Sequence, residues 1–143
     1  MKLFSPYIVA IIVAWVTAQG AKYLLVALKQ RRFDHIRQLY LSGNMPSAHS
    51  ATVTALSVTV ALHNGLDSAL FGLTALFAAI VMYDAVMVRR SSGEQGDAIQ
   101  QLIKEQKSKV ALPRAAKGHT PLEVVVGALL GGVIGLVVFL ATH

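Results

Sequence analysis

The chain has 143 residues and contains no cysteine; 55% of its residues are hydrophobic, 14% are charged, and the formal net charge is +6. This length fits one domain, residues 1–143, but the composition is too apolar for a soluble domain of that size. Disulfides and thiolate chemistry are excluded, because both need cysteine.

Four apolar segments are long enough, or nearly so, to cross a hydrocarbon core, which requires roughly 20 residues per helix. They cover residues 6–28, 46–62, 68–88 and 121–142. The second is short and rich in Ser and Thr, so we expect it to be buried among the others and to face lipid little. The sequence therefore predicts an all-α, polytopic membrane helix bundle with about four transmembrane helices plus short interfacial helices.

Positive charge is distributed unevenly between the ends of these helices. Eleven of the thirteen Lys and Arg residues follow the first or the third segment, whereas the hairpin at 63–67 has none. The positive-inside bias makes both basic segments cytoplasmic and puts both termini outside, in an integral protein of a bacterial cytoplasmic membrane. This polarised charge suits membrane lipids or a phosphorylated ligand. Nucleic acid is not expected, because no basic face is free of the membrane.

Two connecting segments are expected to form short interfacial helices. Residues 30–45 carry four apolar side chains at helical spacing beside basic residues: Phe33, Ile36, Leu39 and Tyr40. In 89–120 a second apolar stripe is formed by Ala98, Ile99, Leu102 and Ile103. For this second stripe, an interfacial helix and a solvated linker helix fit the pattern equally well.

The stretch GNMPSAHSA, residues 43–51, has the composition of an anion site. Pro46 suits the first turn of a helix, whose unpaired N–H groups and positive dipole end attract anions where small residues allow close approach. Ser47 and Ala48 fit that need, and His49 would point into the same place. The alternative is that His49 is a capping or interfacial residue.

The fourth segment begins with a similar arrangement, KGHTPLEVV. Thr120, Pro121 and Glu123 have the pattern of a capping box, which needs no function. His119 and Glu123 are also four residues apart. A carboxylate that holds one imidazole nitrogen leaves the other available as a nucleophile or base, so the two histidine motifs suit phosphoryl transfer.

Such a site needs fixed cations. The candidates are Arg89, Arg90, Arg114 and Lys22, although stop-transfer charges at a membrane boundary would explain the first two equally well. Lys22 and Asp84 lie inside apolar segments, where charges are usually paired or functional. We expect an ion pair between Lys22 and Asp84, with direct participation in the site as the alternative.

Three blocks in order, MPSAHS, YDAVMVRRSSGEQ and GHTPLEVVVGALLG, together resemble the divergent branch of the type 2 phosphatidic acid phosphatase superfamily, which is related to acid phosphatases and vanadium-dependent haloperoxidases. The resemblance covers about residues 19–136. It implies that His119 becomes phosphohistidine, that Glu123 stands where an aspartate usually orients it, and that His49 is the general acid. Ser47 and the backbone near Ala48 would hold phosphate.

The chain departs from the superfamily pattern at several positions. The usual Arg-Pro ahead of the first histidine motif is missing, and Lys22 and the pair Arg89–Arg90 are the candidates to replace it. The arginine that usually stands six residues before the nucleophile falls on Pro113, one position before Arg114. Two functions therefore stay open. One is a lipid phosphate or pyrophosphate phosphatase that needs neither metal nor cofactor, and the other is a non-catalytic protein that binds or translocates a phosphorylated lipid.

A glycine stripe in the fourth segment indicates close helix packing. It is formed by Gly127, Gly131 and Gly135. The partner helix is either in a second copy, which would give a homo-oligomer, or in the same chain.

Overall fold

The computed structural model describes residues 5–30, 45–113 and 118–143. Every regular element in this part of the chain is helical, which confirms the predicted all-α class. The elements are α1 (Pro6–Gln30), α2 (Ala48–Asn64), α3 (Ala69–Tyr83), the π-helix η2 (Asp84–Val88), α4 (Arg89–Glu105) and α5 (Pro121–Thr142). The interfacial helix expected at 30–45 lies almost entirely outside the described residues.

Within the described residues, three helices are long and apolar enough to cross a membrane: Pro6–Leu28, the continuous helix Ala69–Glu105, and Pro121–Thr142. α2 has 17 residues and is therefore about 25 Å long, which is less than the roughly 30 Å of a hydrocarbon core. It contacts α1, α3 and α5. This position confirms that the short second segment is buried among the others.

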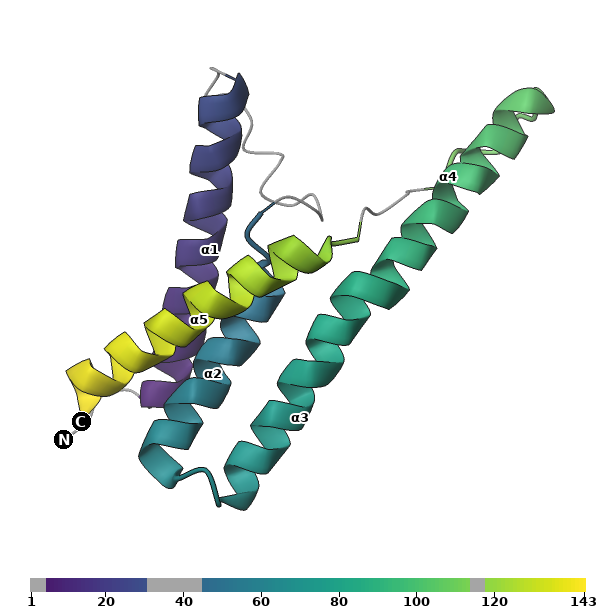
Figure 1. Ribbon diagram of the computed structural model, residues 1–143. Helices are drawn as coiled ribbons and strands as arrows, with labels where there is room; N and C mark the ends of the chain where they lie inside the picture. Colours follow the sequence, from purple (N-terminus) through teal and green to yellow (C-terminus); the bar gives the residue numbers. More distant parts are fainter. Residues whose placement is uncertain (1–4, 31–44, 114–117) are drawn as a thin grey trace.

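The third apolar segment continues through η2 into α4 with no loop between them (Figure 1). The stripe around Ile99 and Leu102 is helical, as expected, but it belongs to an extension of α3 and not to a separate short helix. The sequence between Tyr83 and Glu105 holds no proline, so nothing in it forces the helix to end. At about 1.5 Å per residue, the 37 residues are roughly 55 Å long, so α4 extends well beyond a hydrocarbon core.

α5 packs on α2 through its glycine stripe. A Cβ at Gly127 would lie 2.5 Å from the Ser47 carbonyl oxygen, and one at Gly135 would lie 2.8 Å from that of Ala55. A Cβ at Gly131, between them, would collide with the backbone of Ala51. Glycine at every fourth position of α5 thus faces a carbonyl group at every fourth position of the α2 segment. The stripe is therefore covered by α2 of the same chain, which is one of the two arrangements left open by the sequence.

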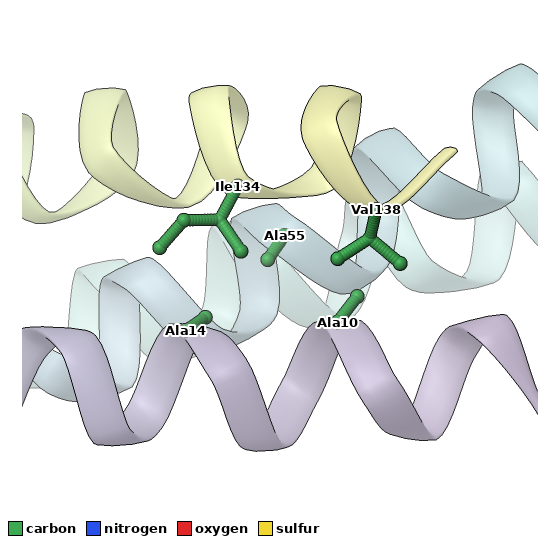
Figure 2. Close-up of a cluster of buried hydrophobic side chains, with 5 residues drawn as sticks. All are labelled: Ala10, Ala14, Ala55, Ile134 and Val138. Carbon is green, nitrogen blue, oxygen red and sulfur yellow. The ribbon is translucent and has the colours of Figure 1, made fainter. Parts of the chain in front are cut away.

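Small residues also bring α1 close to the other helices. Ala10, Ala14 and Ala18 follow one another at every fourth position and are fully buried. Figure 2 shows two of these alanines opposite Ala55 of α2 and a pair of branched residues of α5. Since lipid tails are as apolar as these side chains, close packing is the main source of stability here.

The start of α1, the end of α2 and the end of α5 lie together at one end of the bundle (Figure 1). The Tyr7 hydroxyl donates a 2.6 Å hydrogen bond to Asn64 Oδ1. The His63 ring stacks edge-on against Tyr7 and against Phe139. The starts of α2 and α5 are therefore at the opposite end, where the motifs with histidine occur.

Candidate functional site

His119 immediately precedes the first turn of α5, and its ring is oriented by that turn. His119 Nδ1 lies 3.0 Å from Glu123 Oε2, and the His119 side chain is 5% exposed. The same carboxylate oxygen accepts the Thr120 N–H at 3.1 Å, while the Thr120 hydroxyl oxygen accepts the Glu123 N–H. The predicted capping box is confirmed. The capping box and the contact with the His119 ring are therefore compatible, because one Glu123 oxygen binds both groups.

The first turn of α2 is organised by Ser47, which is fully buried. Ser47 is the N-cap, and its Oγ accepts the Ser50 hydroxyl at 2.9 Å as well as the Ser50 N–H. The helix begins at Ala48. Pro46 thus lies before the N-cap and not in the first turn, because Ser47 takes the extended conformation that a cap requires.

A backbone hydrogen bond joins the beginnings of α2 and α5. The Ser47 N–H donates to the Glu123 carbonyl oxygen at 3.1 Å. Glu123 lies one helical turn before Gly127, which also packs against Ser47. The hydrogen bond and the glycine stripe therefore set the same register between α2 and α5. Two helix N-termini, each a favourable place for an anion, therefore lie side by side in a parallel pair.

Lys22 is placed at this end of the bundle by α1. It follows Ala18 by four residues on the same stripe and is 5% exposed. Its ammonium interacts electrostatically with Glu123. A buried cation thus acts on the carboxylate that holds His119.

The Lys22–Asp84 ion pair that we expected is not formed between these two described residues. Asp84 Oδ2 instead contacts Arg89 Nε at 2.6 Å, and the carboxylate that acts on Lys22 is Glu123. The position of Lys22 and Asp84 within apolar segments was not enough to predict that they pair, because pairing also depends on which helix faces are in contact. Lys22 lies on the face of α1 that packs against α2 and α5, and Asp84 is bonded within its own helix.

His49 is in the first turn of α2, and its side chain is exposed. The imidazole interacts electrostatically with both members of the Asp84–Arg89 pair, with His119 and with Lys22. The structure thus brings both histidines and two of the expected cations into one electrostatic neighbourhood.

Arg90, the other expected cation that the structure describes, is not part of this group. Arg90 Nε contacts Glu94 Oε1 at 3.1 Å, and both side chains are exposed. Arg114, expected to bind phosphate, lies outside the described residues, as does Lys117.

Two contacts to the backbone of the third helix were not anticipated from the sequence. The His119 N–H donates to the Ala85 carbonyl oxygen at 3.1 Å. A Cβ at Gly118 would collide with the backbone of Arg90. Contacts made by main-chain atoms leave no side-chain pattern; the glycine before the histidine is the one sign of them in the sequence.

The sequence profile of the Divergent PAP2 family matches residues 4–134. The chain belongs to this family. A relative from Bacillus subtilis (strain 168), the uncharacterized membrane protein YuiD, is 38% identical over 153 aligned positions, which cover 96% of each chain. No solved structure matches the chain. The resemblance drawn from the three sequence blocks is confirmed, and the protein is a PAP2-like membrane protein.

Proposed function

We propose that this PAP2-like protein is a phosphatase that hydrolyses a lipid phosphate or pyrophosphate through a phosphohistidine at His119. The observation that carries the proposal is the 3.0 Å contact between His119 Nδ1 and Glu123 Oε2 beside two helix N-termini. In this proposal the site faces the cytoplasm, both termini are outside, and the membrane is a bacterial cytoplasmic membrane.

The ring contact defines which nitrogen reacts. A proton on Nδ1 donated to the carboxylate leaves the lone pair on Nε2, and the carboxylate stabilises the positive charge that develops when Nε2 forms a bond. The neighbouring N-termini supply backbone N–H groups for the phosphate oxygens. Lys22 and Arg89 supply fixed positive charge, which stabilises the developing negative charge far more strongly in a site of low polarity than in water.

The reaction has two displacements at phosphorus. His119 Nε2 attacks the phosphorus, the bond from phosphorus to the leaving oxygen breaks, and protonated His49 donates its proton to that oxygen. Water then attacks the phosphohistidine, the bond from phosphorus to Nε2 breaks, and His49 takes the proton from the water. The products are an alcohol, or a lipid monophosphate from a pyrophosphate, and inorganic phosphate. Protein groups regain their starting states.

The test is turnover and trapping of the intermediate. Purified protein in detergent is given a panel of lipid phosphates and pyrophosphates. After an alkaline quench, which preserves phosphohistidine, the protein is examined for the label of a radioactive phosphoryl group. We expect turnover and labelling in the wild type, and neither in His119→Ala. His143→Ala is the matched control, since His143 is an exposed histidine at the other end of the bundle.

A non-catalytic function predicts a different result. If the wild type binds a lipid phosphate without turning over any substrate in the panel, and His119→Ala binds it as tightly, the phosphatase proposal is refuted. The same helix N-termini and cations would then bind or translocate a phosphorylated headgroup.

A further inference from the structure

The π-helix η2 (Asp84–Val88) interrupts the third helix beside the segment that leads into α5. π-helices are rare, occur mostly as single turns within α-helices, and are frequent at functional sites. The five residues DAVMV contain neither glycine nor proline. An ordinary α-helix is therefore open to this sequence, and other interactions must favour the wider turn.

The wider turn changes which backbone groups are paired. In η2 the Arg89 N–H donates to the Asp84 carbonyl oxygen, five residues earlier. In an α-helix that N–H would donate to Ala85, four residues earlier. The Ala85 carbonyl oxygen is the group that accepts the His119 N–H at 3.1 Å. The π-turn thus exchanges a bond within the helix for a bond to the residue that carries the reactive imidazole.

The side chains of the same two residues are also joined. Arg89 Nε and Asp84 Oδ2 are 2.6 Å apart. On an α-helix, residues three and four apart are neighbours, whereas those five apart are rotated away from each other. The wider π-turn brings positions five apart together. The ion pair is therefore matched to the π-helix and stabilises it relative to the α-helix.

The segment ahead of His119 is pressed against this turn. Any Cβ at Gly118 would meet the backbone N and Cα and the Cβ of Arg90. His119 is consequently held from two directions. Its ring is held by Glu123 of α5, and its backbone is held by Ala85 of η2.

From this geometry we propose that Asp84 and Arg89 form a positioning pair that maintains the π-turn, so that the Ala85 carbonyl fixes the His119 backbone. The role in positioning a nucleophile rests on the proposed function, whereas the structural link from the ion pair to His119 does not. Asp84 does not touch the substrate in this proposal.

Amide hydrogen exchange of the full-length protein in detergent measures the link without any need for turnover. In the wild type we expect the His119 N–H to be protected. In Asp84→Ala it should exchange on the order of tenfold faster, the effect of losing one hydrogen bond. Asp84→Glu retains a carboxylate and should keep most of the protection. The Ala51 N–H, which donates to the Ser47 carbonyl oxygen, is the internal reference for global unfolding.

Glu94→Ala is the matched control, because it removes the carboxylate of the Arg90–Glu94 pair, which has the ordinary four-residue spacing of an α-helix. It should leave His119 exchange unchanged. If Asp84→Ala does not fold, Asp84→Asn removes the same negative charge while it keeps a side chain of the same shape. Unchanged protection of the His119 N–H in folded Asp84→Ala or Asp84→Asn, or an equal loss of protection in Glu94→Ala, would overturn the proposal.

Kinetics separate this role from a merely structural one. A poorly positioned His119 should lower kcat by about tenfold, equivalent to 1.36 kcal/mol in the barrier, with KM unchanged and with recovery in Asp84→Glu. A rise in KM alone would overturn the positioning role. If the wild type has no phosphatase activity but Asp84→Ala still exposes the His119 amide, the proposed function fails and the structural link stands.

Discussion

Replacement of Gly131 by alanine tests the packing that brings the two helix N-termini side by side. The added Cβ would lie 2.8 Å from the Ala51 carbonyl carbon and 2.9 Å from its Cα. These are backbone atoms, which cannot rotate away as a side chain would, so α5 must move off α2. Overpacking of this kind costs about 1–3 kcal/mol. Gly131→Leu should prevent the close contact between the helices altogether.

Gly132→Ala provides the matched control. A Cβ at Gly132 meets nothing within 4 Å, yet the substitution brings the same gain in helix propensity, about 1 kcal/mol. That gain cancels between the two variants. Reversible unfolding in mixed detergent micelles should therefore show Gly131→Ala to be less stable than Gly132→Ala by about 1–3 kcal/mol. Equal stability of the two variants would refute the close approach of α5 to the α2 backbone.

Two further predictions concern the histidines and the topology. His49→Ala should lose about 10²–10⁴-fold in rate on an alkyl phosphate and recover partly on a nitrophenyl phosphate, whose leaving group needs little protonation; equal loss on both substrates would contradict the general-acid role. His119→Ala should be inactive on both, and Glu123→Gln should fall between the two. Cysteines at Asn64 and Ser108 should react with an impermeant thiol reagent from opposite sides of the membrane, and labelling of both from one side would contradict the topology.

The boundaries of helices were predictable where the sequence contains their stop and start signals. The fourth segment was predicted at 121–142, which is the observed extent of α5, because Thr120, Pro121 and Glu123 specify its first turn. The third segment was predicted to end at Val88, but the helix continues to Glu105. Charged residues at 89 and 90 mark the edge of the apolar span and do not break a helix. Hydropathy therefore located the end of the apolar span and not the end of the helix.

Within the site, contacts inside one helix were predictable and contacts between helices were not. The four-residue spacing of His119 and Glu123 was enough to predict that they meet. The expected pairing of Lys22 with Asp84 is not found between these two described residues, because a contact between helices depends on their register. The bond from His119 to Ala85 was missed because it joins two main-chain groups and also depends on a π-turn that no residue type specifies.

A glutamate at position 123, where the resemblance implies an aspartate, suits the position of this residue in α5. Glu123 is the third residue of the helix, and from there the capping box requires a side chain that reaches back to the N–H of the N-cap, a role filled by glutamate or glutamine. Its Oε2 reaches both the Thr120 N–H and the His119 ring. The Glu123 carbonyl oxygen also accepts the Ser47 N–H from α2. The Glu123 side chain thus contacts the His119 ring and also caps the helix. The position of the carboxylate is therefore fixed by the start of a helix that is itself held in register with α2.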